Sequence, residues 1–493
     1  MHASHIIDYL KLDAVELSEH IARGDMTAEH AMRCALELAG RYDEPYGVLC
    51  HAHPEAALES ARQGRPGTRF AGVPFLLKDS GLPSTRLPSS VGSRLFSDTC
   101  YAQDSTLASR LEQAGLIPFA RTRVSELCMA PTSEAVRYGG PTRNPWAPER
   151  SAGGSSGGSA VAVALGIVPM AHGSDGGGSV RIPAACCGVF GFKPSRGLLP
   201  VGPLKGESLG GMATDGVLSQ TVRDSAALLD AVSGYEPGSP YASPVCAKPL
   251  SASVVPAIGR ARLRVGVWRE AWNGVPIAQP CLQAVQQAAD LCRELGHEVV
   301  DLPLPNFNYD QFVDAHATML ATTIARLVDA RLRQTGQSLA DGDLEPAIAD
   351  GYTLGKRIDA ITYAGAVDCF HGVGRAIERA MASCDLILSP ALTTLPVKLG
   401  TLTPVGGFLD FRRRVSEYTT FLAIINASGQ PAASVPLYWT ADGLPVAVQL
   451  IGHFGQDDLV MRLAAEFERA APWHGRLARF RGDAYAQALE RAA

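Results

Sequence analysis

Short apolar runs alternate with longer amphipathic segments along much of the chain, and this alternation predicts an α/β fold. The runs of strand length lie at residues 72–79, 116–120, 168–172, 264–267, 297–300, 385–388, 432–435 and 446–450. The segments with helical spacing of apolar residues lie at 104–114, 221–232, 280–295 and 457–470, and the last of these is expected to close the chain. A succession of strands and helices favours a sheet with helices packed on it.

Two helices are expected before the first of these strands. Asp13 followed by Glu16 is a capping-box pattern, and Gly24 is a typical end for the helix that begins there. Thr27 is expected to begin a second helix that runs to Gly40. We expect this helical pair to lie on the outside of the main body.

The middle of the chain combines caps, a loop and a long helical region. Asp104 is expected to cap its helix, and residues 221–224 form a second capping-box pattern. Residues 234–259 are rich in Pro, Gly, Ser and Ala, which predicts a loop. Residues from about 310 to 384 are mostly helical in pattern, and we expect them to cover one edge of the sheet and to shape a pocket. No internal repeat or clean boundary appears, so a single domain over 1–493 is expected.

Composition narrows the class of protein. The chain has 493 residues, 46% of them apolar and 19% charged, with a net charge of −5, so a sizeable core is expected and no basic surface for nucleic acid or a membrane. No apolar run reaches the length of about 18 residues that a membrane span needs. The N-terminus lacks a signal-peptide pattern, and the eleven cysteines are scattered without CxxC pairs. These features favour reduced thiols, a cytoplasmic location, no zinc site and a small neutral or polar ligand.

Two glycine-serine clusters, at 153–159 and 175–179, are the most informative stretches. The apolar segment 160–165 that follows the first has the composition of a buried helix, and 180–183 continues the second without a break, which argues against flexible linkers. Glycine allows positive φ and close approach of another molecule, and successive N–H groups in such a turn can converge on an oxyanion.

Two conventional interpretations of these clusters fit poorly. The residues 153–157 satisfy G-x-S-x-G, the nucleophile elbow of α/β-hydrolases, but that elbow follows a strand, whereas 144–150 contain two prolines. A phosphate-binding loop would need G-x-x-x-x-G-K-[ST], which neither cluster has, and Asp175 would repel an anion.

A third interpretation is a serine hydrolase with a lysine as its base. A buried, neutral lysine can take the proton of a serine hydroxyl, and Lys78 ends an apolar run. Ser179 follows three glycines whose amides could line up beside its hydroxyl, and Ser155 could relay a proton between the two. The alternative for Lys78 is a solvated surface lysine paired with Asp79.

The motifs in combination resemble the amidase signature family. They are Gly72-Val73-Pro74 with Lys78-Asp79, then Gly153-Gly154-Ser155-Ser156-Gly157-Gly158-Ser159, then Asp175-Gly176-Gly177-Gly178-Ser179-Val180-Arg181-Ile182-Pro183. They stand in the family's order, and further similarity at 139–146, 191–197 and 443–449 extends the resemblance over most of the chain. It is weakest over about 240–380.

The resemblance implies a fold and a set of roles. The fold would be a single large α/β/α domain with a mixed, mostly parallel central sheet, a signature core at about 60–235, a helical pocket-forming region at about 306–384 and C-terminal strands and a helix at 385–493. The roles implied are Ser179 as nucleophile, Lys78 as base, Ser155 as bridging serine after a cis peptide bond, the amides of Gly176, Gly177, Gly178 and Ser179 as oxyanion hole, Ser156, Asp175 and Arg181 as supporting residues, and Cys128, Met129, Ala130 and Pro131 as part of the acyl pocket. For Cys128 a buried, small apolar residue without a chemical role is the alternative.

Two departures from the family's pattern bear on the substrate. Gly176 stands where many members have threonine, which keeps the amides but removes a hydroxyl, and this form resembles the 6-aminohexanoate cyclic dimer hydrolase branch. Arg123 stands where lysine is common in a Lys-Thr-Asn motif, which puts a substrate contact from this position in doubt.

The function implied is hydrolysis of a small, largely uncharged carboxamide, such as a linear or cyclic amide, an anilide or a related carbamate. Water would be the second substrate, and no cofactor, metal, nucleic acid or membrane would be needed; a homodimer is compatible with this function. Two alternatives are the amide-hydrolysing subunit of a transamidation complex and a pseudo-enzyme that binds amides without turnover.

Overall fold

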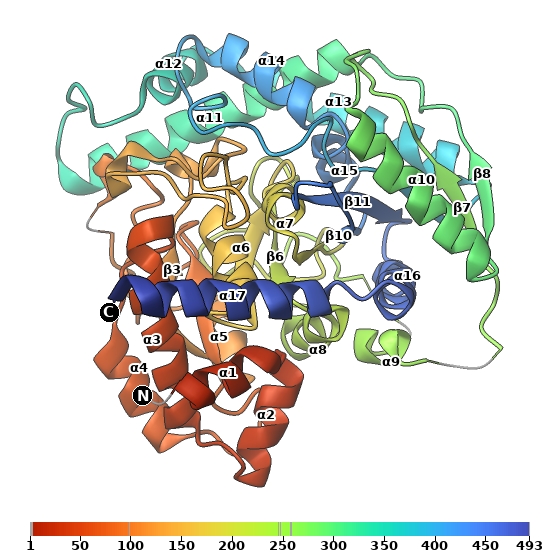
Figure 1. The fold of residues 1–493 in the computed structure, drawn as a ribbon. Coiled ribbons are helices and arrows are strands. Elements are labelled where there is room, and N and C mark those ends of the chain that lie inside the picture. The colour runs from red at the N-terminus through yellow and green to blue at the C-terminus, as the bar shows by residue number, and fades with distance from the viewer. Residues whose placement is uncertain (1–2, 98, 245, 247, 257–258, 493) are drawn as a thin grey trace.

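The computed structural model describes residues 3–492 apart from 98, 245, 247, 257 and 258, and it contains two sheets surrounded by helices (Figure 1). The small sheet has the order β1 (Leu49–Cys50), β3 (Ile117–Thr122), β2 (Pro74–Lys78). The large sheet has the order β4 (Met170–Asp175), β6 (Thr214–Ser219), β5 (Phe190–Lys193), β10 (Ala432–Trp439), β11 (Pro445–Gly452), β9 (Leu386–Pro390), β7 (Arg264–Val267), β8 (Glu298–Asp301).

The helices occupy most of the remaining chain. Those of the N-terminal half are α1 (Ala3–Lys11), α2 (Ala14–Arg23), α3 (Ala28–Tyr46), α4 (Pro54–Gln63), α5 (Thr106–Gln113), α6 (Gly157–Ala164), α7 (Arg181–Cys187) and α8 (Val222–Val232). Those of the C-terminal half are α9 (Leu250–Val254), α10 (Gln279–Glu294), α11 (Tyr309–Thr335), α12 (Pro346–Gly355), α13 (Ala360–Met381), α14 (Phe408–Tyr418), α15 (Ala423–Ser428), α16 (Asp457–Ala470) and α17 (His474–Ala492). The α/β class expected from the sequence is confirmed.

The strand directions correct one part of the expected fold. The large sheet is mixed. The neighbouring pairs β4–β6, β6–β5, β5–β10, β10–β11 and β11–β9 are antiparallel, whereas β9–β7 and β7–β8 are parallel. The expectation of a mostly parallel sheet is therefore wrong. A parallel pair needs a crossover connection such as a helix, and α10 supplies one between β7 and β8, whereas a tight turn at Thr440–Gly443 joins β10 to β11 as a hairpin.

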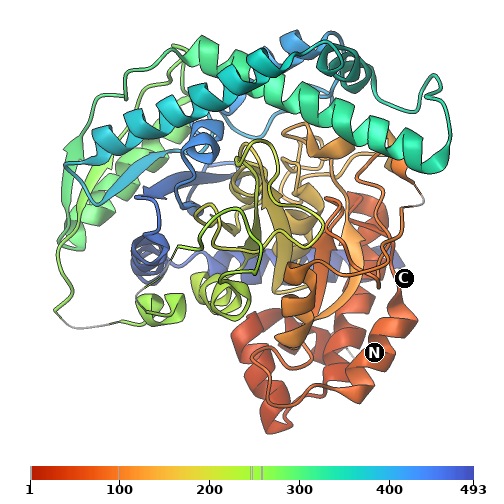
Figure 2. The ribbon, with the colours of Figure 1, turned by 180° about the vertical axis from the view of Figure 1, so that it is seen from behind.

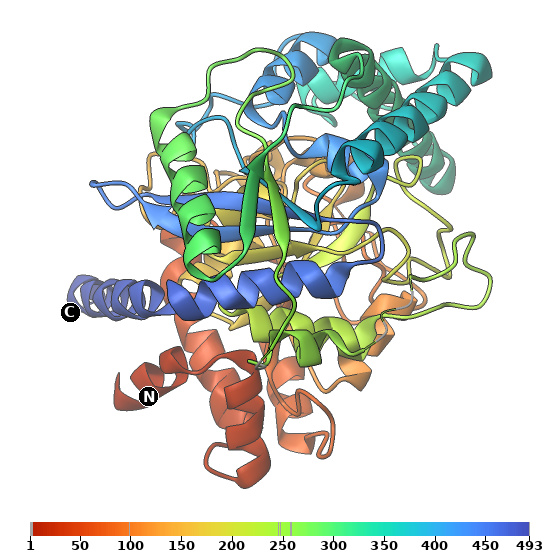
Figure 3. The same ribbon diagram turned by 90° about the vertical axis from the view of Figure 1, so that its right-hand side faces the viewer.

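The region at 310–384 is mostly helical, as expected, because it holds α12, α13 and nearly all of α11. Figures 1 and 2 show α11, α12, α13 and α14 arching over the top of the molecule, and α11 contacts the other three. Figure 3 shows α16 running along the strands on the opposite side and α10 beside β7 and β8. How the chain divides into domains stays a prediction.

The predicted helix starts are mostly confirmed. Asp13 caps α2 with a reciprocal bond from Glu16, and Gly24 ends that helix in the left-handed conformation. Thr27 caps α3, but the helix continues through Gly40 to Tyr46, because an isolated glycine is tolerated inside a helix at a cost of about 1 kcal/mol.

Two cap predictions need correction. The cap of α5 is Ser105, which accepts from the Ala108 amide, whereas Asp104 accepts from the Thr85 amide in another segment. Thr221 caps α8 as predicted, but Asp224 does not complete the capping box. The Asp224 carboxylate instead accepts from the first two amides of α2, so it links the N-terminal helices to the main body.

The last helix of the described chain, α17, was not predicted, because the closing helix was expected to be α16. In Figure 1 α17 crosses the molecule next to α1, which it contacts. Its Arg481 is buried and donates to the carbonyl oxygens of Val163 at 2.6 Å and Ala164 at 3.1 Å, at the end of α6. All eight residues of α6 are buried, as the apolar segment predicts. Arg481 thus donates to carbonyl groups in the last turn of a buried helix, where donors from the helix itself run out.

We predict that Arg481→Met lowers the free energy of unfolding by about 3 kcal/mol, because it removes the donor to the buried Ala164 carbonyl and to the side-chain oxygen of Gln220. Urea denaturation followed by circular dichroism measures the loss. Arg479→Met, an exposed position on the same helix, is the control and is expected to change stability by less than about 0.5 kcal/mol. Equal unfolding midpoints for the two variants would contradict the role assigned to Arg481.

Candidate active site

Strand β2 carries Lys78 into the interior. All five residues of β2 are buried, and Lys78 has no exposed surface. Its neighbour Asp79 is not its partner, because that carboxylate accepts hydrogen bonds from Ser89 and Ser90 at 2.5 and 2.7 Å and from Tyr138 at 2.8 Å. The alternative of a surface lysine paired with Asp79 is therefore wrong.

The amine of Lys78 contacts hydroxyl and carbonyl groups rather than a carboxylate. Its Nζ lies 2.8 Å from Ser155 Oγ, 2.9 Å from Ser174 Oγ and 3.0 Å from the Ser174 carbonyl oxygen. No acidic side chain of the described residues forms an ion pair with it. Burial lowers the pKa of Lys78, against smaller opposing effects of Cys128, Asp175 and Asp215. A neutral amine with two N–H groups for Ser174 and a lone pair for the Ser155 hydroxyl fits these three contacts.

Ser155 is held by the tightly packed backbone of the first glycine-serine cluster. The peptide bond between Gly154 and Ser155 is cis, as the resemblance implied. A side chain at Gly154 would meet the Thr132 carbonyl oxygen at 2.0 Å, so only glycine fits there. Ser133 Oγ donates to the carbonyls of Gly153 and Ser155 at 3.1 and 3.2 Å. Ser155 is thereby fixed at the start of α6.

Ser179 lies on the second cluster, between β4 and α7, and is half-buried. Its carbonyl oxygen accepts from the Ser156 hydroxyl at 2.5 Å and from the Ser156 amide at 3.2 Å, so the two clusters are tied together through Ser156. Ser155, Ser174 and Ser179 border the same pocket.

The expected oxyanion hole needs one correction. The Gly178 amide donates to Asp175 Oδ1 at 2.7 Å and does not border the pocket, so it is not available for a ligand. The amides of Gly176, Gly177 and Ser179 have no acceptor among the described residues, and all three residues border the pocket. Free amides on adjacent residues beside a hydroxyl are the donors that an oxyanion would need.

Asp175 and Arg181 form a fully buried ion pair behind this loop. Arg181 donates to Asp175 Oδ1 and Oδ2 at 2.8 and 3.0 Å, and the Asn426 amide group adds a bond to Oδ1 at 2.9 Å. Burial opposes the charge of Asp175, but the Arg181 guanidinium prevails and holds the pKa of this carboxyl well below its usual range. Arg181 also donates to Gln449 Oε1 at 2.7 Å, so the pair connects the loop to β11.

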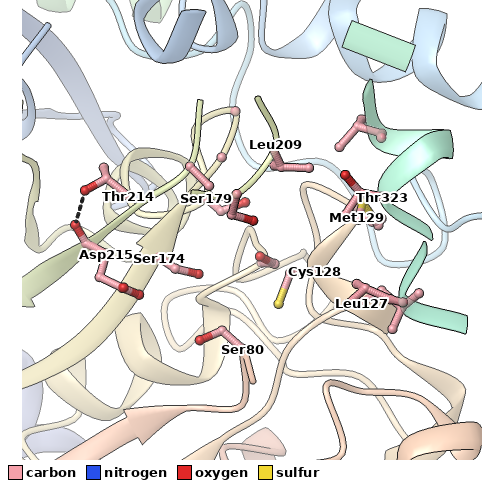
Figure 4. Close-up of a pocket in the computed structure, with 18 of the residues that line it drawn as sticks. Ser80, Leu127, Cys128, Met129, Ser174, Ser179, Leu209, Thr214, Asp215 and Thr323 are labelled. Atoms are coloured by element: carbon pink, nitrogen blue, oxygen red, sulfur yellow. Dashed lines mark hydrogen bonds between the residues drawn. The ribbon is translucent and has the colours of Figure 1, made fainter. Parts of the chain in front are cut away.

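The pocket above these residues has a volume of about 180 Å³. In Figure 4 Ser174 and Ser179 lie on one side, Met129 and Thr323 on the other, and Cys128 between them. All four residues of the expected acyl-pocket segment, Cys128 to Pro131, line the pocket. Burial raises the pKa of the Cys128 thiol, which keeps it protonated at neutral pH. Arg123 does not line the pocket, and its Nε donates to the Leu49 carbonyl.

Several residues at the site had no signal in the sequence analysis. Ser174 precedes the second cluster by one residue, and its position next to the motif is the signal that could have identified it. Asn426 is near no recognised motif. His316 on α11 and Arg412 on α14 both line the pocket. Neither helix contains a motif on which the family resemblance rests.

One cluster of the described residues has the side chains of a metal site. The ligand atoms of Cys50, His51 and Asp79 all lie within 4.8 Å of one another. Both oxygens of Asp79 already accept hydrogen bonds from Ser89, Ser90 and Tyr138, and the charge of the buried Arg121 acts on the same carboxylate. A metal ion would have to displace these hydrogen-bond donors, and it would lie close to the positive charge of Arg121. The surroundings of Asp79 are therefore poorly suited to binding a metal ion.

No helix of the described chain has both the length and the apolar character to span a membrane. A cytoplasmic location and a homodimer stay predictions.

Comparisons with known proteins agree with this geometry. The sequence matches the Amidase family over residues 32–461. It is 33% identical over 481 residues to a 6-aminohexanoate-cyclic-dimer hydrolase of Paenarthrobacter ureafaciens, with 94% of this chain and 96% of the relative covered. The structure of a 6-aminohexanoate cyclic dimer hydrolase complexed with substrate is similar with a TM-score of 0.87 at 29% identity, covering 96% of this chain and 99% of that one. A bacterial aryl acylamidase is similar with a TM-score of 0.85 at 27% identity, covering 95% and 98%. The chain therefore belongs to the amidase signature family, and it is a hydrolase that acts on C–N bonds of amides.

Proposed function

We propose that the enzyme hydrolyses a small carboxamide through an acyl-enzyme on Ser179, with Ser155 and Lys78 as the proton-transfer chain. The observation that carries the proposal is the 2.8 Å contact of a fully buried lysine amine with the Ser155 hydroxyl, on the pocket that Ser179 also borders. A serine hydroxyl is a weak nucleophile until a base removes its proton, and a desolvated lysine is a suitable base.

In the first half of the reaction, the Ser179 oxygen attacks the amide carbon while its proton passes to Ser155, whose own proton passes to Lys78. The amides of Gly176, Gly177 and Ser179 donate to the oxyanion that forms. Return of a proton from Lys78 through Ser155 to the departing nitrogen breaks the C–N bond and releases the amine. Water then attacks the acyl carbon while one of its protons passes through Ser155 to Lys78. The ester bond to Ser179 breaks, the proton returns through Ser155 to the Ser179 oxygen, and the carboxylic acid leaves.

The substrate is proposed to be neutral around the scissile bond. The relatives include cyclic-dimer hydrolases and an aryl acylamidase, which supports cyclic or linear amides, anilides and related carbamates as substrate classes. The pocket lining includes Ile182, Leu209 and Met129, whose apolar surface suits the carbon skeleton of such a molecule.

Ser179→Ala is predicted to abolish labelling by a serine-directed fluorophosphonate and to lower kcat/KM on an anilide by at least about 1,000-fold, because the acylated atom is removed. Gel fluorescence and a chromogenic anilide assay measure the two effects. Ser109→Ala, on α5 and outside the pocket, serves as the control that keeps both. Stoichiometric labelling of the Ser179→Ala protein would disprove the assignment.

The pH dependence of kcat/KM is predicted to report the ionisation of Lys78. Because burial lowers the pKa of this lysine, the neutral, active form is present above that pKa, and activity falls as the pH drops below it. Lys78→Ala is expected to lose at least about 1,000-fold in kcat/KM and to lose this acid limb.

Lys193 offers a matched control for the pH profile. It is also buried, its pKa is lowered to about 7 by burial, and it lies outside the pocket lining, with its Nζ donating to the Pro194 carbonyl. Lys193→Met is expected to keep the acid limb of the profile. Near-wild-type kcat/KM in Lys78→Ala, or an acid limb that disappears with Lys193 instead, would overturn the role of Lys78.

A further inference from the structure

Arg412, on α14, is a buried cation in the wall of the pocket. Its residue surface is 9% exposed, and it lines the pocket together with Ser179. Its Nη1 donates to the Met129 carbonyl at 2.9 Å, and its guanidinium lies over the Phe411 ring at 5.8 Å. Met129 belongs to the acyl-pocket segment, so the guanidinium is anchored to the part of the wall expected to hold the acyl group.

No acidic side chain of the described residues forms an ion pair with Arg412, and its Nε and Nη2 groups donate to no acceptor there. The adjacent Arg413, which is exposed, does have such a partner, Asp410 at 3.6 Å. Burial lowers the pKa of Arg412 to about 10, which leaves it cationic at neutral pH.

Three other buried arginines of the described chain, Arg121, Arg181 and Arg481, donate hydrogen bonds from all three side-chain nitrogens. Arg181 pairs with Asp175 and also donates to Asn426 and Gln449. Arg121 donates through Nε, Nη1 and Nη2 to the carbonyls of residues 78, 82, 87 and 88, and Arg481 donates to those of 10, 163 and 164. A buried guanidinium is costly unless its charge or its donors are matched, and Arg412 differs from these three because its Nε and Nη2 have no acceptor among the described residues. This difference points to a ligand.

The surroundings of Arg412 place that ligand near the reacting serine. Arg412, His316 and Gly177 border both the main pocket and a small adjoining recess. His316 lies against Gly177, within 3.2 Å of where a side chain there would begin. Burial, with a smaller contribution from Arg412, keeps the pKa of His316 well below its usual value, so the imidazole is neutral and does not repel an anion.

Two other pocket-lining cations, Lys205 and Arg326, are the competing candidates. Both residues are exposed, so water reaches their side chains. Burial of its amine does lower the pKa of Lys205, but the nearby carboxylate of Asp215 opposes that effect, whereas Arg412 has no carboxylate partner among the described residues. The buried charge gains far more from an anion than the solvated ones do.

We propose that Arg412 binds a carboxylate at the far end of the substrate's acyl group, so that the preferred substrates are N-substituted monoamides of dicarboxylic acids. This inference rests on the proposed function and modifies the expectation of a largely uncharged substrate: the scissile amide is neutral, but the acyl chain ends in one negative charge. The guanidinium offers Nε and Nη2 as a two-point donor for the carboxylate.

The first test compares kcat/KM for paired anilides, namely those of succinic, glutaric and adipic acid against butanoic, pentanoic and hexanoic acid. We expect the wild-type enzyme to prefer the carboxylate member of at least one pair tenfold or more, and Arg412→Gln to abolish that preference. Arg412→Lys, which keeps the charge but not the two-point geometry, should retain part of it. Arg413→Gln makes the same change one residue away on the exposed side of α14 and should leave the preference intact.

The second test measures binding without turnover. With the Ser179→Ala protein, calorimetry compares the monoamide of glutaric or adipic acid with pentanamide or hexanamide, and then repeats the comparison in a Ser179→Ala, Arg412→Gln double variant. Tighter binding of the acid that vanishes in the double variant supports the subsite even if the enzyme hydrolyses none of the anilides, an outcome that would instead count against the proposed function.

The proposal is overturned if wild type and Arg412→Gln show the same ratio for every pair, or if Arg413→Gln reduces the ratio as much as Arg412→Gln. It is also overturned if the preference survives Arg412→Gln and disappears in a Lys205→Met, Arg326→Met double variant, since the anion would then be bound by the exposed cations.

Discussion

The arrangement around Lys78 depends on one constraint: an amine buried without a counter-ion has to be neutral or leave the interior. Taking a charged ammonium out of water without a partner costs several kcal/mol, whereas a neutral amine needs only ordinary hydrogen bonds. The surrounding structure supplies those bonds, two from Ser174 and one from Ser155. The backbone of Lys78 is itself fixed, because its amide donates to His172 Nδ1 at 3.2 Å. The amine is therefore held where it can act as a base.

A second buried group, the carboxylate of Asp175, is charged where Lys78 is neutral. Asp175 keeps its charge because Arg181 matches it, and the pair holds the loop that carries Ser179 from behind. Arg181 and Asn426 extend this pair to β11 and α15, more than 240 residues along the chain. The Gly178 amide is used in this support, which is why the free amides are those of Gly176, Gly177 and Ser179. The conformation of the second glycine-serine cluster thus depends on residues from the far end of the chain.

The sequence was informative where function is encoded locally. The two glycine-serine clusters and the apolar strand before Lys78 identify the residues that the structure brings together, and the caps at Asp13 and Thr27 mark helix starts because a cap needs only its own first turn. Strand direction could not be read in the same way, because a buried strand has the same apolar run in either orientation. The short connection between β10 and β11 is a local feature that could have indicated an antiparallel pair.

Residues that act through long-range contacts left no local signal. Arg412 sits in an ordinary amphipathic helix beside Arg413 and Arg414, and nothing in that run of three arginines distinguishes the buried one from its neighbours. The spacing of Asp224 fits a capping box, yet its carboxylate accepts hydrogen bonds from amides of α2 instead. In both cases tertiary packing decides the role of the side chain.

The charges around the pocket also constrain where an anionic substrate group can be bound. A carboxylate close to Lys78 would raise the pKa of the lysine, favour its protonated form and remove the base that the reaction needs. Asp175 avoids this effect in part because Arg181 offsets its charge, and a substrate carboxylate would need a matching cation of its own. Arg412 can offset it from the wall formed by α14, beside a neutral His316 and a protonated Cys128. Pairing Asp175 with Arg181 and a substrate carboxylate with Arg412 would let the enzyme accept an acidic substrate while the lysine stays neutral.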